Sequence, residues 1–213
     1  MFRSGALLIL VASVLFSCSK SAERDADPED FASRVSTEAY LGTAKSTLHL
    51  HGYETFPSVE GEGSFNITNV SGDSVMVALI CRLSTGDGFS FGIPGKQSGK
   101  AWSASFDTGN LVIQENGGMS GLMQTDKQEI SWDGILLTNK MVLDVKIKYL
   151  KQEGNITEGS IINTHLDLAR SGHEGVTTNN GCRVIVWETR SVFNIYSGGV
   201  DILRVPVCHP MKD

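Results

Sequence analysis

The chain has 213 residues, enough for one domain or two small ones. It carries 18 Lys and Arg against 24 Asp and Glu, and this net charge of −6 at pH 7 disfavours nucleic acid and anionic surfaces as partners. The 23 glycines and the recurring short runs of Val, Ile, Thr and aromatic residues are typical of strands and turns rather than helices.

The N-terminus has the three parts of an export signal. Arg3 supplies the cation, Gly5 to Phe16 form an apolar run of 12 residues, and the small residue Ser17 precedes Cys18. A helix that spans a bilayer needs about 20 apolar residues. We therefore expect a signal peptide over residues 1–17 rather than a transmembrane helix.

The segment Leu15-Phe16-Ser17-Cys18 resembles the lipobox of bacterial lipoproteins, with Phe16 bulkier than the residue usual at its position. The resemblance implies that Cys18 becomes the N-terminus, carries a diacylglyceryl group on sulfur and is then acylated. It also implies a lipid-anchored protein of the bacterial cell envelope, with the outer membrane as the expected location. The alternative is a secreted protein cleaved near Cys18.

Residues 18–40 are expected to form the lipidated N-terminus, a flexible tether and a short helix. Ser19 to Asp30 contain no large apolar residue and so favour a spacer. Asp27 followed by Pro28 is typical of a helix start, and we expect a helix to about Ser36. Residues 41–213 are then expected to form a single β-rich domain.

Alternating or continuous apolar runs predict strands in the first half of this domain at 47–51, 63–70 and 74–83. The run Ser74 to Leu83 is apolar on both faces, which is typical of a central strand covered on both sides. Ser84 to Gly99 is rich in Gly, Pro and Ser and predicts a long loop with one short strand at most, around Phe89 to Phe91.

In the second half, Asn116-Gly117-Gly118 lies between two apolar runs and predicts a tight hairpin. Met141 to Leu150 alternates apolar and charged residues, as in an antiparallel strand that is wet on one side. Further strands are expected at 128–132, 135–137, 154–168, 183–188, 191–196 and 201–207.

Ten to twelve short strands with at most one short N-terminal helix predict an all-β antiparallel barrel or sandwich. The pattern over residues 43–168 resembles the calycin (lipocalin-like) up-and-down barrels. The lipocalin Gly-x-Trp signature is absent, and its nearest match, Gly99-Lys100-Ala101-Trp102, has an extra residue. The resemblance implies a binding barrel but assigns no ligand residues.

Cys81, Cys182 and Cys208 remain if Cys18 is lipidated. A three-strand meander through 182–208 would separate Cys182 from Cys208 by far more than the roughly 7 Å that a disulfide allows between Cα atoms. We therefore expect a bond from Cys81 to one of the other two, or no bond. No spacing of a zinc site is present, and no cofactor is expected.

Five residues are weak candidates for binding. Trp102, Trp132 and Trp187 could line a ligand pocket, although core tryptophans are the commoner case. His49 and His51 are two apart on an expected strand and could hold a metal with a third ligand; an exposed pair without metal is the alternative.

Phe106-Asp107-Thr108-Gly109 resembles the aspartic-protease signature, but the chain lacks the second Asp motif that the chemistry needs, and a turn is the alternative. We therefore expect a non-catalytic envelope module that binds a small apolar or amphipathic ligand or an envelope protein. The alternatives are a surface or adhesin subunit that pairs by strand addition, and a hydrolase centred on Asp107 or the two histidines.

Overall fold

The computed structural model describes residues 30–35, 39–53, 55–171, 182–194 and 199–210. In chain order the elements are α1 (Phe31–Val35), β1 (Tyr40–His49), β2 (Val59–Ser71), β3 (Ser74–Leu83), β4 (Gly88–Ser98), β5 (Ala101–Phe106), β6 (Gly109–Ile113), β7 (Gly118–Gln124), β8 (Gln128–Leu136), β9 (Lys140–Tyr149), β10 (Ile161–Arg170), β11 (Cys182–Asn194) and β12 (Gly199–Pro210). The described residues form twelve strands and one short helix, which confirms the all-β prediction. In the described part of the chain, no helix has the length and apolar character needed to cross a membrane.

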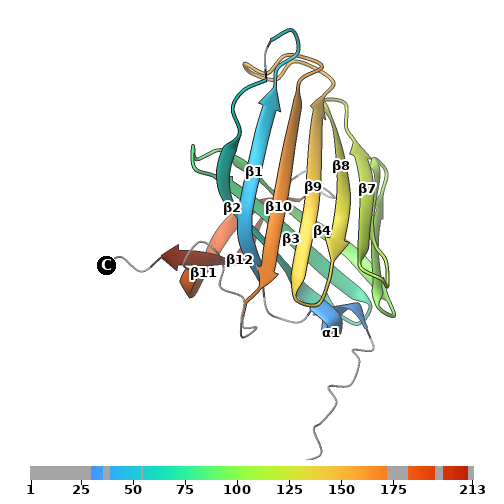
Figure 1. The fold of residues 1–213 in the computed structure, drawn as a ribbon. Helices are drawn as coiled ribbons and strands as arrows, with labels where there is room; N and C mark the ends of the chain where they lie inside the picture. The colour runs from blue at the N-terminus through green and yellow to red at the C-terminus, as the bar shows by residue number, and fades with distance from the viewer. Residues whose placement is uncertain (1–29, 36–38, 54, 172–181, 195–198, 211–213) are drawn as a thin grey trace, which may run out of the picture.

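Strands β1 to β10 close into an antiparallel barrel. Neighbouring strands pair in the order β4-β3-β2-β1-β10-β9-β8-β7-β6-β5, and β4 pairs with β5 to close the ring. Apart from β1–β10, every pairing in the ring joins strands consecutive in the chain (Figure 1). The fold is therefore a ten-stranded up-and-down barrel of the calycin type and not a sandwich.

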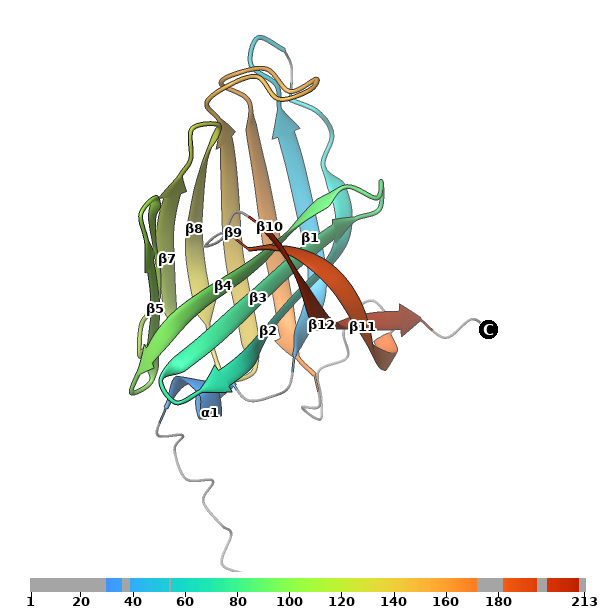
Figure 2. The same cartoon turned by 180° about the vertical axis from the view of Figure 1, so that it is seen from behind.

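The remaining two strands form a hairpin outside the ring. The end of β11 pairs in parallel with β4, Phe193 opposite Phe91 and Asn194 opposite Gly92. The hairpin crosses the wall formed by β2, β3 and β4 (Figure 2). Ala78 points outward from β3 on this wall and is nevertheless fully buried, whereas its outward neighbours Met76 and Ile80 are partly exposed. The prediction that Ser74–Leu83 is covered on both faces is therefore confirmed only at the centre of the strand.

The hairpin corrects the expected meander. Residues 183–196 were predicted as two strands, but β11 runs through 182–194 without a break. Cys182 is opposite Pro210 and Cys208 is opposite Ile185, so both cysteines lie at the same end of the hairpin. Their side chains, like that of Trp187, lie outside the described part. Two alternatives were predicted, a disulfide from Cys81 or no disulfide, and the first is wrong because Cys81 is a buried free thiol.

Helix α1 covers one end of the barrel, here called the closed end (Figure 1). The side chains of Phe31 and Val35 are fully buried, and the Phe31 ring stacks on Trp102 with 6.1 Å between centroids. The Asp30 carboxylate accepts a hydrogen bond from the Ser33 backbone N–H at 2.7 Å, which holds the pKa of Asp30 below its ordinary value. The helix is thus capped at Asp30; the predicted start at Asp27 lies outside the described residues.

The predicted loop at 84–99 is wrong, because most of it forms β4. Its Gly and Pro residues have packing reasons to be in a strand. A Cβ at Gly95 would overlap the Trp102 ring, and Pro94 lies in a part of β4 that has no ladder with β5 and so needs no N–H there. The glycine that suggested a loop instead lets β4 approach the Trp102 ring closely.

The other predicted elements differ mainly in their ends. The Asn116 hairpin is confirmed: the Gln114 N–H donates to the Gly118 carbonyl at 2.8 Å, and Gly117 has a φ of 91°. The segments 128–132 and 135–137 are one strand, β8, and the expected strand 154–168 begins only at Ile161.

Candidate functional site: the mouth of the barrel

The closed end of the barrel is sealed by packing and hydrogen bonds. The Tyr40 hydroxyl donates to the backbone carbonyls of Leu137 and Thr138, at 2.9 and 3.1 Å. The Arg34 guanidinium donates to the Glu115 carbonyl at 2.6 Å and lies 5.6 Å from the centre of the Phe31 ring. Burial lowers the pKa of Arg34 from its ordinary value, but the group stays charged.

The opposite end, here called the mouth, is formed by the loops 50–58, 84–87, 107–108, 125–127 and 150–160. Side chains that point inward near this end remain partly exposed; they are Leu83, Phe89, Phe106 and Ile162. Tyr53 and Phe56 on the β1–β2 loop are 67% and 48% exposed. Apolar side chains are therefore partly exposed to solvent at the mouth, whereas Phe31, Val35 and Trp102 are buried at the closed end.

Two aromatic residues from opposite walls meet below the mouth. Phe91 of β4 and Trp132 of β8 pack edge to face, with 5.8 Å between ring centroids. Because β4 and β8 are not neighbours in the ring of strands, this pair crosses the interior. Phe89 lies 5.1 Å from Phe91, so three rings form a continuous path from the mouth to Trp132.

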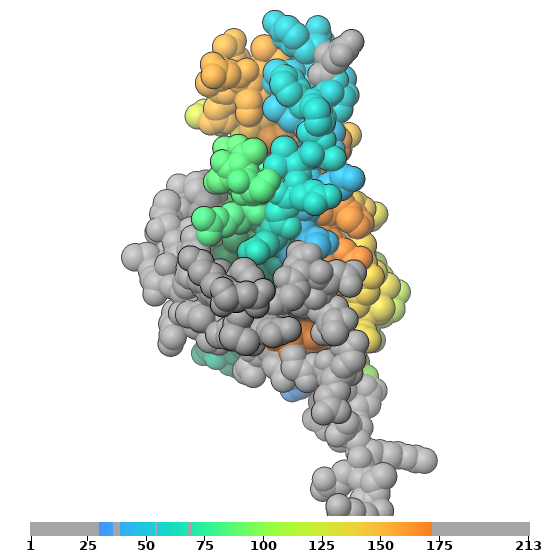
Figure 3. All heavy atoms as spheres, turned by 60° about the vertical axis from the view of Figure 1, so that its left-hand side comes forward, coloured from blue at the N-terminus to red at the C-terminus, as the bar shows by residue number. Residues whose placement is uncertain are grey.

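One side of the rim is held by contacts between the β1–β2 loop and the β9–β10 loop. The His51 backbone N–H donates to Ser160 Oγ at 3.1 Å, and His51 Nδ1 lies 3.1 Å from the Glu158 carbonyl. A Cβ at Gly159 would overlap the His51 ring. Figure 3 shows the two loops packed together at the top of the molecule, in cyan and orange.

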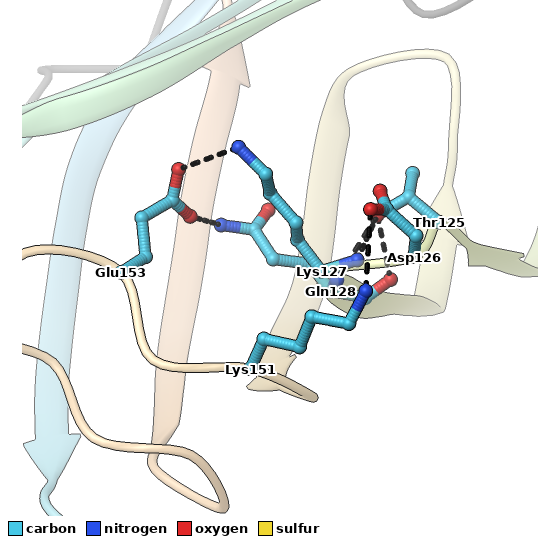
Figure 4. Close-up of polar contacts among 6 residues, drawn as sticks. All are labelled: Thr125, Asp126, Lys127, Gln128, Lys151 and Glu153. Atoms are coloured by element: carbon cyan, nitrogen blue, oxygen red, sulfur yellow. Dashed lines mark hydrogen bonds and ion pairs between the residues drawn. The ribbon is translucent and has the colours of Figure 1, made fainter.

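A set of polar contacts connects the β7–β8 turn to the β9–β10 loop (Figure 4). Lys127 lies 3.8 Å from Glu153, and Lys151 lies 3.4 Å from Asp126. Gln128 Nε2 also donates to Glu153 at 3.0 Å. Each exposed pair contributes little alone, about 0–1 kcal/mol. As a group they make this part of the rim polar and bridge the two loops.

On the other side of the mouth, strands β4 and β5 are not paired with each other. The ladder between β4 and β5 covers only Lys96–Ser98 and Ala101–Ser103, near the closed end. From Gly88 to Gly95, β4 pairs with β3 on one edge and has no β5 partner on the other. On that second edge, the end of β11 pairs with Phe91 and Gly92. Of the described residues, no hydrogen bond or ion pair joins the β3–β4 turn to the β5–β6 turn. This break between β4 and β5 is here called the seam.

The tryptophans that the sequence singled out have different places. Trp102 is a core residue at the closed end, where its Nε1–H donates to the Val75 carbonyl at 3.0 Å. Trp132 lies under the mouth. Phe89 and Phe91, which line the path to it, were predicted as a short strand at most within a long loop and were not named as candidate site residues. Their Phe-Ser-Phe alternation was the available signal.

The histidines do not share a strand face as expected. β1 ends at His49, and His51 lies in the following turn. Both are exposed, and His49 Nδ1 lies 2.8 Å from Thr55 Oγ1. Among the described residues, no group of three or more His, Cys, Asp or Glu side chains is placed to hold a metal ion.

Asp107 lies in the exposed two-residue turn between β5 and β6, where Phe106 pairs with Gly109. The resemblance to the protease motif therefore falls on a hairpin turn. Cys18 lies outside the described residues.

The sequence matches no protein-family model and no curated protein. Among solved structures, it is similar to the S-type phycobiliprotein lyase CPES from Guillardia theta, with a TM-score of 0.43 and 11% sequence identity. The match covers 68% of this chain and 92% of that chain. The strand pairing described above, and not this likeness, defines the fold.

Proposed function

We propose that the protein is a non-catalytic binding module that takes one small apolar or amphipathic molecule into the mouth of its barrel. One observation carries this proposal: the inward-facing side chains of Leu83, Phe89 and Phe106 are partly exposed at the mouth, whereas those of Phe31, Val35 and Trp102 are buried at the closed end. An apolar molecule placed there would remove exposed surface of Leu83, Phe89 and Phe106 from water, and each Å² of apolar surface so buried contributes roughly 25 cal/mol.

The charges of the described residues support a ligand whose inserted part is neutral. Of the buried described residues, Arg34 is the single charged one, and it lies at the closed end on the Glu115 carbonyl. The rim carries exposed charged residues, among them Lys127, Asp126 and Glu153. An amphipathic molecule would therefore leave its polar part at the rim.

A pair of charge variants tests this proposal. Phe106→Glu places a carboxylate at the mouth, whereas Leu122→Glu places the same charge on the outer face of the nearby β7, where Leu122 is 48% exposed. In titrations with the neutral probe N-phenyl-1-naphthylamine, the wild type and Leu122→Glu should show the same saturable binding. Phe106→Glu should bind at least tenfold more weakly, because the probe must then bury a charge. Equal binding by both variants, or no saturable binding by the wild type, would contradict the proposal.

We further propose that lipid on Cys18 anchors the protein in the bacterial envelope. The support is the sequence: a 12-residue apolar run too short to span a bilayer, followed by Leu15-Phe16-Ser17-Cys18. Expressed as the full chain, the protein should partition into detergent on Triton X-114 phase separation, and Cys18→Ala should move it to the aqueous phase. If Cys18→Ala still partitions into detergent, the anchor is not on this cysteine.

A protein partner that pairs by strand addition is the second candidate. β12 is the outermost strand of the described sheet and pairs only with β11, so one of its edges has no strand beside it. Sedimentation of the purified protein over a hundredfold range of concentration tests self-pairing. Oligomers that grow with concentration and disappear in a Leu203→Pro variant on β12 would favour this function over the ligand barrel.

A further inference from the structure

The indole N–H of Trp132 is a buried donor without an acceptor. Trp132 is 2% exposed, and its Nε1 has no hydrogen-bond partner. Trp102, which is equally buried, donates to the Val75 carbonyl at 3.0 Å. Folded proteins rarely leave a buried donor unpaired, because the group loses its water without a replacement. The contrast marks Trp132 as a donor that lacks its acceptor.

The surroundings of Trp132 connect this donor to the mouth. The Phe91 ring packs on the indole and Phe89 packs on Phe91, with Phe89 partly exposed at the end of β4. Both phenylalanines lie in the part of β4 that has no β5 partner, and Phe91 pairs there with Phe193 of β11. A molecule that entered at the mouth beside Phe89 would therefore pass over apolar rings before it reached the indole.

We propose that Trp132 Nε1–H donates a hydrogen bond to an uncharged carbonyl oxygen, as in a ketone, ester or amide, at the inserted end of the ligand. This inference rests on the proposed binding function and names the chemical class of the ligand. A carbonyl accepts without bringing a donor of its own that would need a partner. A carboxylate is disfavoured, because the described buried residues offer only Arg34 as a counter-charge, at the closed end.

Three naphthalene probes of similar size test this class. They are 6-propionyl-2-dimethylaminonaphthalene, which has a ketone, 6-propyl-2-dimethylaminonaphthalene, which has a CH2 group in place of the carbonyl, and 6-dimethylamino-2-naphthoate, which has a carboxylate. The wild type should bind the ketone best, and the emission of the ketone should shift to the red relative to an apolar solvent because its oxygen accepts a hydrogen bond. The carboxylate should bind most weakly.

The variant Trp132→Phe keeps an aromatic ring and removes the N–H. We expect it to bind the ketone about three- to tenfold more weakly, the range of one neutral hydrogen bond, and the probe without a carbonyl as the wild type does. Trp102→Phe is the matched control and should leave the ratio of the two affinities unchanged. Equal losses for both probes in Trp132→Phe, or tightest binding of the carboxylate by the wild type, would overturn the inference while leaving the binding function intact.

A measurement on the unmutated protein covers the case in which Trp132→Phe fails to fold. In ¹H–¹⁵N spectra, the ketone should shift one indole N–H resonance downfield, and the probe without a carbonyl should not. An unchanged set of indole resonances with saturating ketone would overturn the role of Trp132. If none of the three probes binds the wild type, the proposed function itself fails.

Discussion

Replacing Phe31 by Ala tests whether α1 closes the barrel. The side chain is fully buried, lies 6.1 Å from the Trp102 ring and has the Arg34 guanidinium 5.6 Å from its centre. Removing a buried Phe side chain costs about 3–5 kcal/mol, which includes the cavity left behind. Because α1 has only five residues and can relax toward the gap, we expect the lower value, about 3 kcal/mol.

The assay is urea unfolding followed by circular dichroism. With an m-value of about 2 kcal/mol/M, the loss lowers the midpoint by about 1.5 M and leaves the slope unchanged. Phe56→Ala is the control, since Phe56 is 48% exposed and should change stability by less than about 0.5 kcal/mol. An equally small effect of Phe31→Ala would refute the docking of α1 on Trp102 and, with it, the sealed end of the barrel.

Three further predictions concern the interior. Gly63→Ala should destabilise the protein by about 1–3 kcal/mol in the same assay, because its Cβ would overlap the side chain of Leu166, and an unchanged midpoint would contradict the packing of β2 against β10. Trp102→Phe should cost about 1–3 kcal/mol, because the buried Val75 carbonyl loses its donor, and a neutral effect would contradict that bond. Burial raises the pKa of the Cys81 thiol from 9.0 to about 11, so Cys81 should resist iodoacetamide at pH 8, as mass spectrometry of the native protein can show. Since unfolded Cys81 loses its proton first, the free energy of unfolding should fall as the pH rises from about 9 to about 11, and this fall should be smaller in Cys81→Ala.

The strands that a local pattern defines were predicted well. The bounds of Ser74–Leu83 were predicted to the residue, because a continuous apolar run is typical of a central strand. The alternation in Met141 to Leu150 likewise gave β9 and its buried face. Such patterns indicate which faces of a strand are buried, because burial selects apolar residues at fixed spacing within the strand itself.

Most of β4 was missed because its Gly and Pro residues are explained by contacts with residues distant in the chain. Gly95 accommodates the Trp102 ring, and Pro94 is tolerated where the ladder to β5 has ended. Neither reason is visible in the segment itself. His51 was misplaced for a similar reason, because its backbone N–H is held by Ser160 from another loop.

The candidate site was predicted only as a set of residue types. The sequence named Trp132 together with Trp102 and had no means of separating them. What separates them is that one indole N–H finds the Val75 carbonyl and the other finds no acceptor. Barrel closure also brings Phe91 of β4 onto Trp132, a contact between opposite walls that no local pattern encodes.

The most direct test of the central claim is native mass spectrometry of the wild-type protein, purified from its own cells without denaturation. A ligand barrel predicts a reproducible extra mass on the monomer that is lost in Phe106→Glu and kept in Leu122→Glu. A bare monomer mass that also fails to take up the naphthalene ketone would contradict a binding site in the mouth.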